Sequence, residues 1–341
     1  MRLRSRIWSR RRCCEETPMK TWLSLITIAA LAACSPAQDE AMPDADPATP
    51  DDMADIGTPE QEVAEEEAAS PPGTDIYLFA LDWSGEAPVL GASLGGVTRP
   101  GYDNQPFFTD NGGLLYTADD ETGETDIWHL DLASGETMPV TQTPGESEYS
   151  PRIAPDGRLS YIYQPPGGYA GNAYLANPDN SDREPAEALA PVGYYGFSGD
   201  MSAVAVFHLG EPMTLQLIDR TTTPETVTHI ADNPGRSFFR AGRGPALYVT
   251  LADEAGVHTV HALNTQTGEL REMFALPGAS QDFAVAILPD DRITFIAVHE
   301  GQLVWRAWGG WEPIGAIDWL TGVTRLAISP DLSTLAVVAE E

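Results

Sequence analysis

Short apolar segments separated by tight polar turns recur along most of the chain. Equivalent turn residues stand at positions 110, 156, 200, 242, 290 and 331, so the intervals are 46, 44, 42, 48 and 41 residues. Pro, Asp and Gly favour these turns because they preset φ, bond to the nearby backbone or tolerate positive φ. Each copy therefore predicts a β-hairpin. The copies are Asp110-Asn111-Gly112 before LLYTA, Pro155-Asp156-Gly157 before LSYIY, Ser198-Gly199-Asp200 before SAVAVF, Ala241-Gly242 before PALYV, Pro289-Asp290 before ITFIAV and Pro330-Asp331 before LAVVA.

A second unit with strand-like composition alternates with the first. Six copies of each unit predict six four-stranded sheets, because each pair of units supplies the four strands of one sheet. Six such sheets predict an all-β fold, a six-bladed β-propeller whose blades surround a central channel. The copies of the second unit are DIYLFALD from Asp75, DIWHLDL from Asp126, NAYLANPD from Asn172, TLQLIDR from Thr214, HTVHALNTQTG from His258 and QLVWRAWG from Gln302.

The order of the units at the two ends predicts how the ring closes. The domain opens with the second unit, at Asp75, and ends with an isolated first unit, from Leu326 to Val338. The last copy therefore supplies the two strands that the first blade lacks, whereas an open solenoid would leave sheet edges exposed. Strands such as AVAVF are apolar on both faces, as expected for a sheet packed between two neighbours. A β-sandwich of many short strands is the alternative fold, but it does not explain the period.

The N-terminal residues have the pattern of a bacterial lipoprotein signal peptide. An apolar run from Trp22 to Leu31 follows Lys20, and it is shorter than the roughly 20 residues that span a bilayer. Leu31-Ala32-Ala33-Cys34 fits the lipobox, in which the cysteine thiol is acylated and cleavage occurs just before it. We therefore expect residues 1–33 to form a signal peptide and Cys34 to carry the lipid. An ordinary secretory signal is the alternative.

Met19 is a second candidate for the translation start, which would leave residues 1–18 outside the protein. Cys13 and Cys14 lie before the expected cleavage point, so Cys34 is the one cysteine that the mature chain keeps. We therefore expect no disulfide, and the domain must be stabilised by burial alone.

Residues 34–73 have the composition of a tether. After Cys34 they contain twelve acids, seven prolines and no basic residue. Few apolar side chains are present to offset the entropy of ordering, and like charges extend the chain. A binding site for a basic partner is the alternative to a solvated spacer. The expected organisation is thus a signal peptide over 1–33, a lipidated acidic tether over 34–73 and a propeller over 74–341.

The repeats resemble the PD40 type of WD40-like repeat that is typical of TolB-like six-bladed propellers. The resemblance is strongest between residues 102 and 163, and it rests on Tyr102 to Pro106, Asp126-Ile127-Trp128, Thr141 to Gly145, Glu148 to Pro151 and Pro155-Asp156-Gly157. It implies a periplasmic, non-enzymatic interaction propeller. In TolB-like proteins the propeller contacts a peptidoglycan-associated lipoprotein, and a separate N-terminal α/β domain engages the inner-membrane Tol machinery. This sequence has the tether in place of that domain, so the resemblance concerns the propeller alone.

Three segments resemble catalytic or metal-binding motifs, but their positions are better explained by the turns and strands of the repeat. Gly196 to Asp200 is close to a G-x-S-x-G nucleophile elbow, but its register predicts a hairpin turn. His258 and His261 are three residues apart in a predicted strand, which places them on opposite faces. The acidic segment from Asp119 to Asp126 lacks EF-hand spacing. We therefore expect no catalytic residue, no metal and no cofactor.

Tryptophans gather near the sixth pair of units, at 305, 308, 311 and 319. Trp305 lies in a predicted strand and fits the core. Trp308 and Trp311 flank the Gly309-Gly310 turn, and they are the candidate contacts for a ligand or partner, including a glycan.

The charge of the propeller segment limits its partners. Residues 74–341 contain 37 acids, 12 arginines and no lysine. Nucleic acid is disfavoured because phosphate binding needs clustered positive charge. An anionic membrane surface is disfavoured as well, so we expect membrane attachment through the lipid only.

Together these features predict a lipid-anchored, monomeric scaffold propeller on the periplasmic face of the outer membrane, where Ser35 after the lipidated cysteine resembles outer-membrane sorting. It would bind another envelope protein through one rim or the channel mouth. A ligand- or glycan-binding propeller is the alternative function, and an enzyme with an axial active site is the third.

Overall fold

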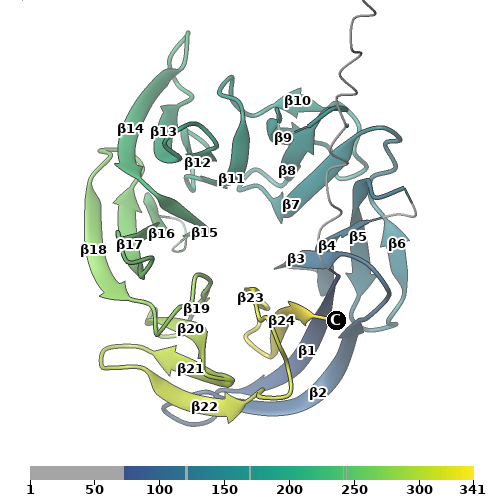
Figure 1. The fold of residues 1–341 in the computed structure, drawn as a ribbon, viewed down its shortest axis with the longest axis vertical. Helices are drawn as coiled ribbons and strands as arrows, with labels where there is room; N and C mark the ends of the chain where they lie inside the picture. The colour runs from purple at the N-terminus through teal and green to yellow at the C-terminus, as the bar shows by residue number, and fades with distance from the viewer. Residues whose placement is uncertain (1–72, 120–121, 169, 241, 243) are drawn as a thin grey trace, which may run out of the picture. The chain divides into compact units, whose positions relative to one another are not determined.

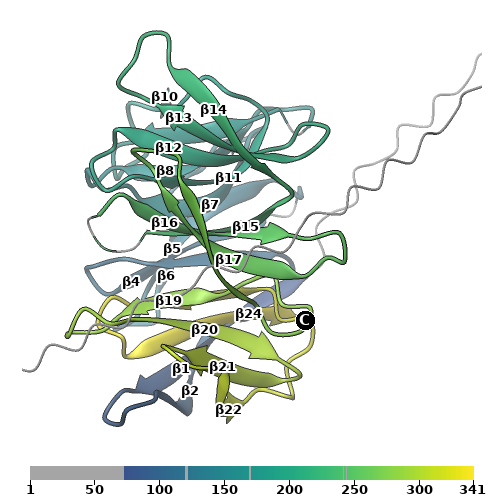
Figure 2. The ribbon, with the colours of Figure 1, turned by 90° about the vertical axis from the view of Figure 1, so that its left-hand side faces the viewer.

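The computed structural model describes residues 73–341 apart from 120–121, 169, 241 and 243. These residues form 24 strands in six four-stranded antiparallel sheets, arranged as blades around a central axis (Figure 1). In the side view the outer strand β14 crosses in front of the inner strand β11 (Figure 2). The predicted all-β six-bladed propeller is therefore confirmed.

Each blade contributes one strand to each of four concentric positions. The innermost strands are β3 (Asp103–Phe108), β7 (Ser147–Ile153), β11 (Val192–Phe197), β15 (Pro234–Arg240), β19 (Ala284–Ile287) and β23 (Arg325–Ile328). The second strands are β4 (Gly113–Asp119), β8 (Leu159–Gln164), β12 (Ala203–His208), β16 (Ala246–Ala252), β20 (Ile293–His299) and β24 (Thr334–Glu340). The third are β5 (Thr125–Asp131), β9 (Asn172–Ala176), β13 (Thr214–Asp219), β17 (His258–Asn264), β21 (Gln302–Arg306) and β1 (Thr74–Asp82). The outer strands are β6 (Thr137–Pro139), β10 (Glu184–Pro185), β14 (Thr226–Asp232), β18 (Leu270–Ala275), β22 (Glu312–Ala316) and β2 (Val89–Val97).

The first and last strands of the propeller share one sheet, in the order β2-β1-β24-β23. Strand β1 pairs with β24 from Thr74↔Glu340 to Ala80↔Thr334. The yellow C-terminal strands lie beside the blue N-terminal strands (Figure 1). This arrangement confirms the predicted closure, in which the final hairpin completes the first blade.

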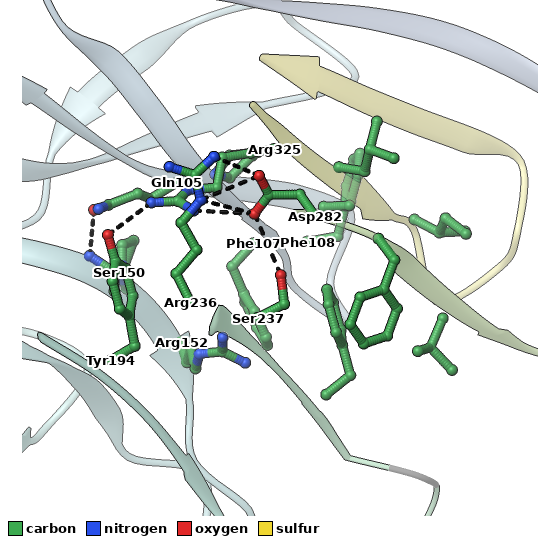
Figure 3. Close-up of a pocket in the computed structure, with 18 residues that line it drawn as sticks. Gln105, Phe107, Phe108, Ser150, Arg152, Tyr194, Arg236, Ser237, Asp282 and Arg325 are labelled. Carbon is green, nitrogen blue, oxygen red and sulfur yellow. Dashed lines mark hydrogen bonds and ion pairs between the residues drawn. The ribbon is translucent and has the colours of Figure 1, made fainter. Parts of the chain in front are cut away.

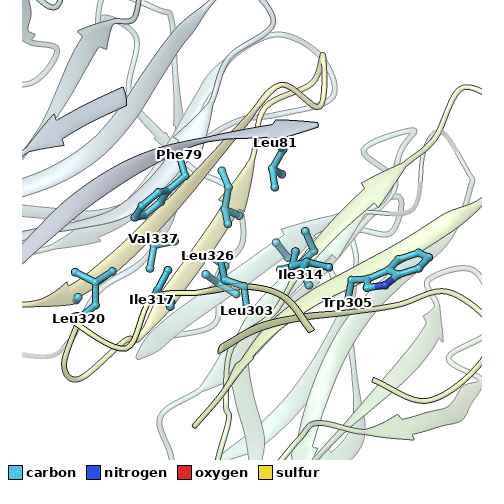
Figure 4. Packing of buried hydrophobic residues seen from close by; sticks show 13 residues of the cluster. Phe79, Leu81, Leu303, Trp305, Ile314, Ile317, Leu320, Leu326 and Val337 are labelled. Atoms are coloured by element: carbon cyan, nitrogen blue, oxygen red, sulfur yellow. The ribbon is translucent and has the colours of Figure 1, made fainter. Parts of the chain in front are cut away.

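The core is divided among the blade interfaces, because the second strand of each blade buries residues on both of its faces. Along β24, Leu335, Val337 and Ala339 pack toward the blade of β19–β22 (Figure 4). Their neighbours Ala336 and Val338 pack toward the blade of β3–β6. Successive side chains of a strand point to opposite faces, so uninterrupted apolar segments are what a blade requires.

In four of the hairpin turns, after Asp156, Asp200, Asp290 and Asp331, the residue directly after the aspartate is left-handed. Gly157 occupies this position with φ of 89° in the intact Pro-Asp-Gly copy, whereas Met201 and Leu332 occupy it with φ of 61° and 65°. Side chains with a Cβ are rarely stable there, so hydrogen bonds support the degenerate turns. In one of them, Ser198 Oγ donates to Asp200 Oδ1 at 2.7 Å.

Cys34, the expected signal peptide over 1–33 and nearly all of the expected tether over 34–73 lie outside the described residues. Within the described part of the chain, no helix has the length and hydropathy needed to cross a membrane.

Candidate functional site: the axial cavity

The innermost strands of the six blades line a cavity of about 160 Å³ on the propeller axis (Figure 3). One side of this axial cavity is polar and carries three guanidinium groups and one carboxylate. The other side is apolar. The polar side is formed by Gln105, Ser150, Arg152, Tyr194, Arg236, Ser237, Asp282 and Arg325, and the apolar side by residues such as Phe107, Phe239, Phe283 and Val285.

Asp282 joins two of the guanidinium groups. Arg236 Nε donates to Asp282 Oδ1 at 3.0 Å, and its Nη2 donates to Oδ2. Arg325 Nη1 donates to Asp282 Oδ1 at 3.1 Å, while its Nη2 donates to the Tyr194 hydroxyl at 3.0 Å. Burial by itself would lower the pKa of Arg325, but the neighbouring Tyr194 and Asp282 oxygens outweigh burial and raise this pKa above the ordinary arginine value. One carboxylate therefore holds two cations from different blades in a fixed geometry.

Arg152 is the third cation, and no described carboxylate lies within ion-pair distance of it. Its Nη1 donates to the Phe238 carbonyl at 2.7 Å, and its guanidinium lies 5.8 Å from the centre of the Tyr195 ring. Burial and the charges of Arg325 and Arg240 lower the pKa of Arg152. These effects mean that an anion close to the guanidinium would be stabilised.

β-Bulges in the innermost strands position the polar side of the cavity. The register shifts between Asn104 and Phe107 in β3 and between Tyr149 and Arg152 in β7. At these bulges Gln105 and Ser150 have φ of 55° and 54°. Gln105 Oε1 accepts hydrogen bonds from Ser150 N at 2.6 Å and from Thr117 Oγ1 at 2.9 Å. Such bulges re-aim side chains and expose backbone groups, and the sequence repeat did not predict them.

A second, larger cavity of about 530 Å³ shares Gln105 and Tyr194 with the axial cavity. We call it the tyrosine cavity because Tyr102, Tyr149 and Tyr194 line it together with aliphatic side chains. Its other lining residues are Ile162, Gln164, Gly171, Val192, Gly193 and Leu209. It lies where the innermost strands β3, β7 and β11 begin.

The tryptophans chosen from the sequence do not line either cavity. Trp308 is 83% exposed, whereas Trp311 packs edge-on against Phe274 and donates from Nε1 to the Ala275 carbonyl at 3.2 Å. Trp305 is buried in the core, as its strand position predicted. Trp308 is thus the more accessible of the two candidate contacts.

The segment that resembles a nucleophile elbow and the histidine pair both lie in turns or strands of the blades. Ser198 lies in the turn between β11 and β12, and His258 is buried in β17, where burial lowers its pKa. Among the described residues, no group of three or more His, Cys, Asp or Glu is placed to hold a metal ion.

The repeat motif itself forms a hydrogen-bond network. Asp126 Oδ1 accepts from Thr141 Oγ1 at 3.0 Å and from Thr143 N at 3.2 Å. Thr143 Oγ1 in turn donates to Glu148 Oε1 at 2.6 Å. Burial of Glu148 raises its pKa to about 7. These hydrogen bonds therefore connect the blade of β3–β6 to β7, the first strand of the next blade.

Comparison with known proteins identifies the fold. No protein-family model matches the chain, and no curated protein matches its sequence. The putative TolB from Agrobacterium tumefaciens is similar in structure, with a TM-score of 0.57 and 11% identity over 80% of this chain and 99% of that chain. A chain in the nidogen/laminin complex matches with a TM-score of 0.51 and 12% identity over 78% of this chain and 98% of that chain.

TolB from Acinetobacter baumannii matches with a TM-score of 0.48 and 13% identity over 79% of this chain. The match covers 64% of that TolB, so this chain spans less than two thirds of its length. The similarity to the Agrobacterium tumefaciens structure shows that the chain is a TolB-like propeller in fold, and its function has to be inferred from its own sites.

Proposed function

We propose that this protein is a lipid-anchored propeller of the bacterial envelope that binds a protein partner at the channel mouth beside the tyrosine cavity. The predicted lipobox and acidic tether support the anchor. Tethering of this kind raises the effective concentration of the propeller near the membrane. The resemblance of the repeats to PD40 propellers supports a periplasmic location and a partner such as a peptidoglycan-associated lipoprotein.

The tyrosine cavity is the observation that carries the binding role. Three tyrosines from neighbouring blades surround a hollow with aliphatic walls. Tyrosine is enriched at the energetic centres of protein interfaces, because its ring is large and rigid and its hydroxyl bonds at the edge. A partner's apolar side chain inserted here would lose contact with water on most of its surface.

Non-enzymatic function is supported by the chemistry of the axial cavity. Its lining includes no histidine, and its one carboxylate, Asp282, is held by two guanidinium groups. A general base needs a free lone pair near the reacting proton. Glycan binding is the second candidate function, and the exposed indole of Trp308 favours it.

Tyr149→Ala tests the binding role. We expect this substitution to weaken capture of the envelope partner by about tenfold or more, as expected for an interface anchor. The measurement is co-purification from cross-linked native envelopes, followed by titration with the captured protein. Tyr77→Ala is the matched control, because Tyr77 is also half-buried but lies in β1 and does not line the cavity. Equal capture by the two variants, at equal melting temperatures, would reject this site.

Cys34→Ala tests the anchor. Because only the thiol can take the lipid, the variant should lose both labelling by a fatty-acid probe and sedimentation with membranes. Ser35→Ala provides the control and should keep both. Labelling of Cys34→Ala to the level of the parent would show that the lipobox is not used.

A further inference from the structure

We propose that the axial cavity binds a small organic acid, with its carboxylate at Arg152 and its apolar body against the phenylalanine side of the cavity. This proposal does not depend on the protein-binding role at the channel mouth. It assigns a class of ligand to the axial cavity, which the packing of the blades against one another does not require.

The first support is an excess of positive charge. Three of the chain's arginines, Arg152, Arg236 and Arg325, line one cavity that contains a single carboxylate. The rest of the domain is strongly acidic, since residues 74–341 carry 37 acids against 12 arginines. Guanidinium groups that are gathered on the axis, away from the acidic surface, create a local field that attracts a small anion.

The second support is the state of Arg152. Its described partners are a carbonyl oxygen and an aromatic ring, neither of which neutralises its charge. A guanidinium carries five N–H donors in a planar fork that matches a carboxylate. Partial burial of a cation without a counter-ion costs desolvation free energy, and a carboxylate that binds to it would offset that cost.

The apolar side of the cavity defines the rest of the ligand. Phe107, Phe239, Phe283 and Val285 line the cavity together with the arginines. A hydrated inorganic anion gains nothing from these side chains, whereas the body of an organic acid would bury apolar surface against them. A volume of about 160 Å³ limits the occupant to a small molecule. The negative surface of the domain further disfavours polyanions.

Asp282 sets the strength of the site. It already forms ion pairs with Arg236 and Arg325, and so occupies part of the donor capacity that these two groups could offer a ligand. With Arg152 included, three guanidinium groups against one carboxylate leave the cavity with a net positive charge, which attracts an anion. Removing the charge of Asp282 should therefore tighten anion binding.

The test is calorimetric titration of the chain from Ser35 to Glu341 with sodium benzoate, sodium acetate and inorganic phosphate in chloride-free buffer. We expect benzoate to bind more tightly than acetate, and acetate more tightly than phosphate. Arg152→Gln should weaken benzoate binding by about tenfold or more, the effect of losing a charge-assisted pair. Arg158→Gln removes the same charge from an exposed turn, where Arg158 pairs with Asp156 and Glu184, and should leave binding unchanged.

Asp282→Asn supplies the readout that a purely structural role would not produce, because it should increase benzoate affinity. Phosphate binding equal to or tighter than benzoate would overturn the organic-acid assignment. Equal affinity of the parent and a folded Arg152→Gln variant would overturn the site. The protein-binding role at the tyrosine cavity is measured separately with Tyr149→Ala, so either proposal can fail without the other.

Discussion

Deletion of residues 325–341 is expected to abolish cooperative unfolding of the propeller. The deletion removes β23 and β24, so β1 loses the partner with which it pairs from Thr74 to Ala80. It also removes the apolar side chains that fill the interfaces on both sides of the first blade. The two strands that remain in that blade would expose an unpaired edge. Differential scanning calorimetry should show no sharp transition, and size-exclusion chromatography should show aggregation.

Deletion of residues 36–72 is the control for this experiment. It removes more residues than the first deletion but no strand of the described propeller. We therefore expect its transition to match that of the parent. If the chain without residues 325–341 melted like the parent, the terminal hairpin would not be what closes the ring.

Glu187→Gln is expected to stabilise the propeller at alkaline pH. Glu187 lies between β10 and β11 and is 3% exposed, and its Oε1 accepts a hydrogen bond from Ala173 N at 3.0 Å. Burial, together with the charge of Glu225, raises the pKa of Glu187 from 4.5 to about 8, although the hydrogen bond from Ala173 N and the charge of Arg220 oppose this change. The folded protein thus holds the proton more tightly than the unfolded chain does.

The sign of the pH dependence follows from this difference. The stabilising contribution of the neutral carboxyl is complete below the ordinary glutamate pKa, and it is lost as the pH rises through about 8. Since one pKa unit corresponds to about 1.4 kcal/mol, ionisation in place costs a few kcal/mol. Glutamine stays neutral at every pH, so the variant should melt several degrees above the parent near pH 9 and close to it near pH 5.

Thermal melts across this pH range provide the measurement, and Glu269→Gln at an exposed position provides the control. The pKa of Glu148 is also raised, to about 7. The melting temperature of the Glu187→Gln variant should therefore still fall as the pH rises, but less steeply than that of the parent. A Glu187→Gln variant that loses stability equally at both pH values would show that Glu187 is ionised in the fold.

The propeller architecture could be predicted because its causes are local and repeated. A turn of Pro, Asp or Gly between apolar segments specifies a hairpin wherever it occurs, and six such copies specify six blades. The complementary units at the two ends indicated that β23 and β24 would join β1. Outer strands were predicted less well. The segment after NAYLANPD forms only the two-residue strand β10, because outer positions bury little surface and the apolar pattern is weak there.

The chain's order of apolar and turn residues, by itself, determined the number of blades, the closure, the turn position of Ser198 and the strand position of His258. The axial cavity was decided by the tertiary structure. Arg152, Arg236 and Arg325 lie in different repeats, and no local pattern distinguishes them from surface arginines. They converge with Asp282 because the ring brings the innermost strand of every blade to one axis, where bulges re-aim their neighbours. Periodicity is encoded over a few residues, whereas a site on the symmetry axis depends on contacts between residues that are distant in the chain.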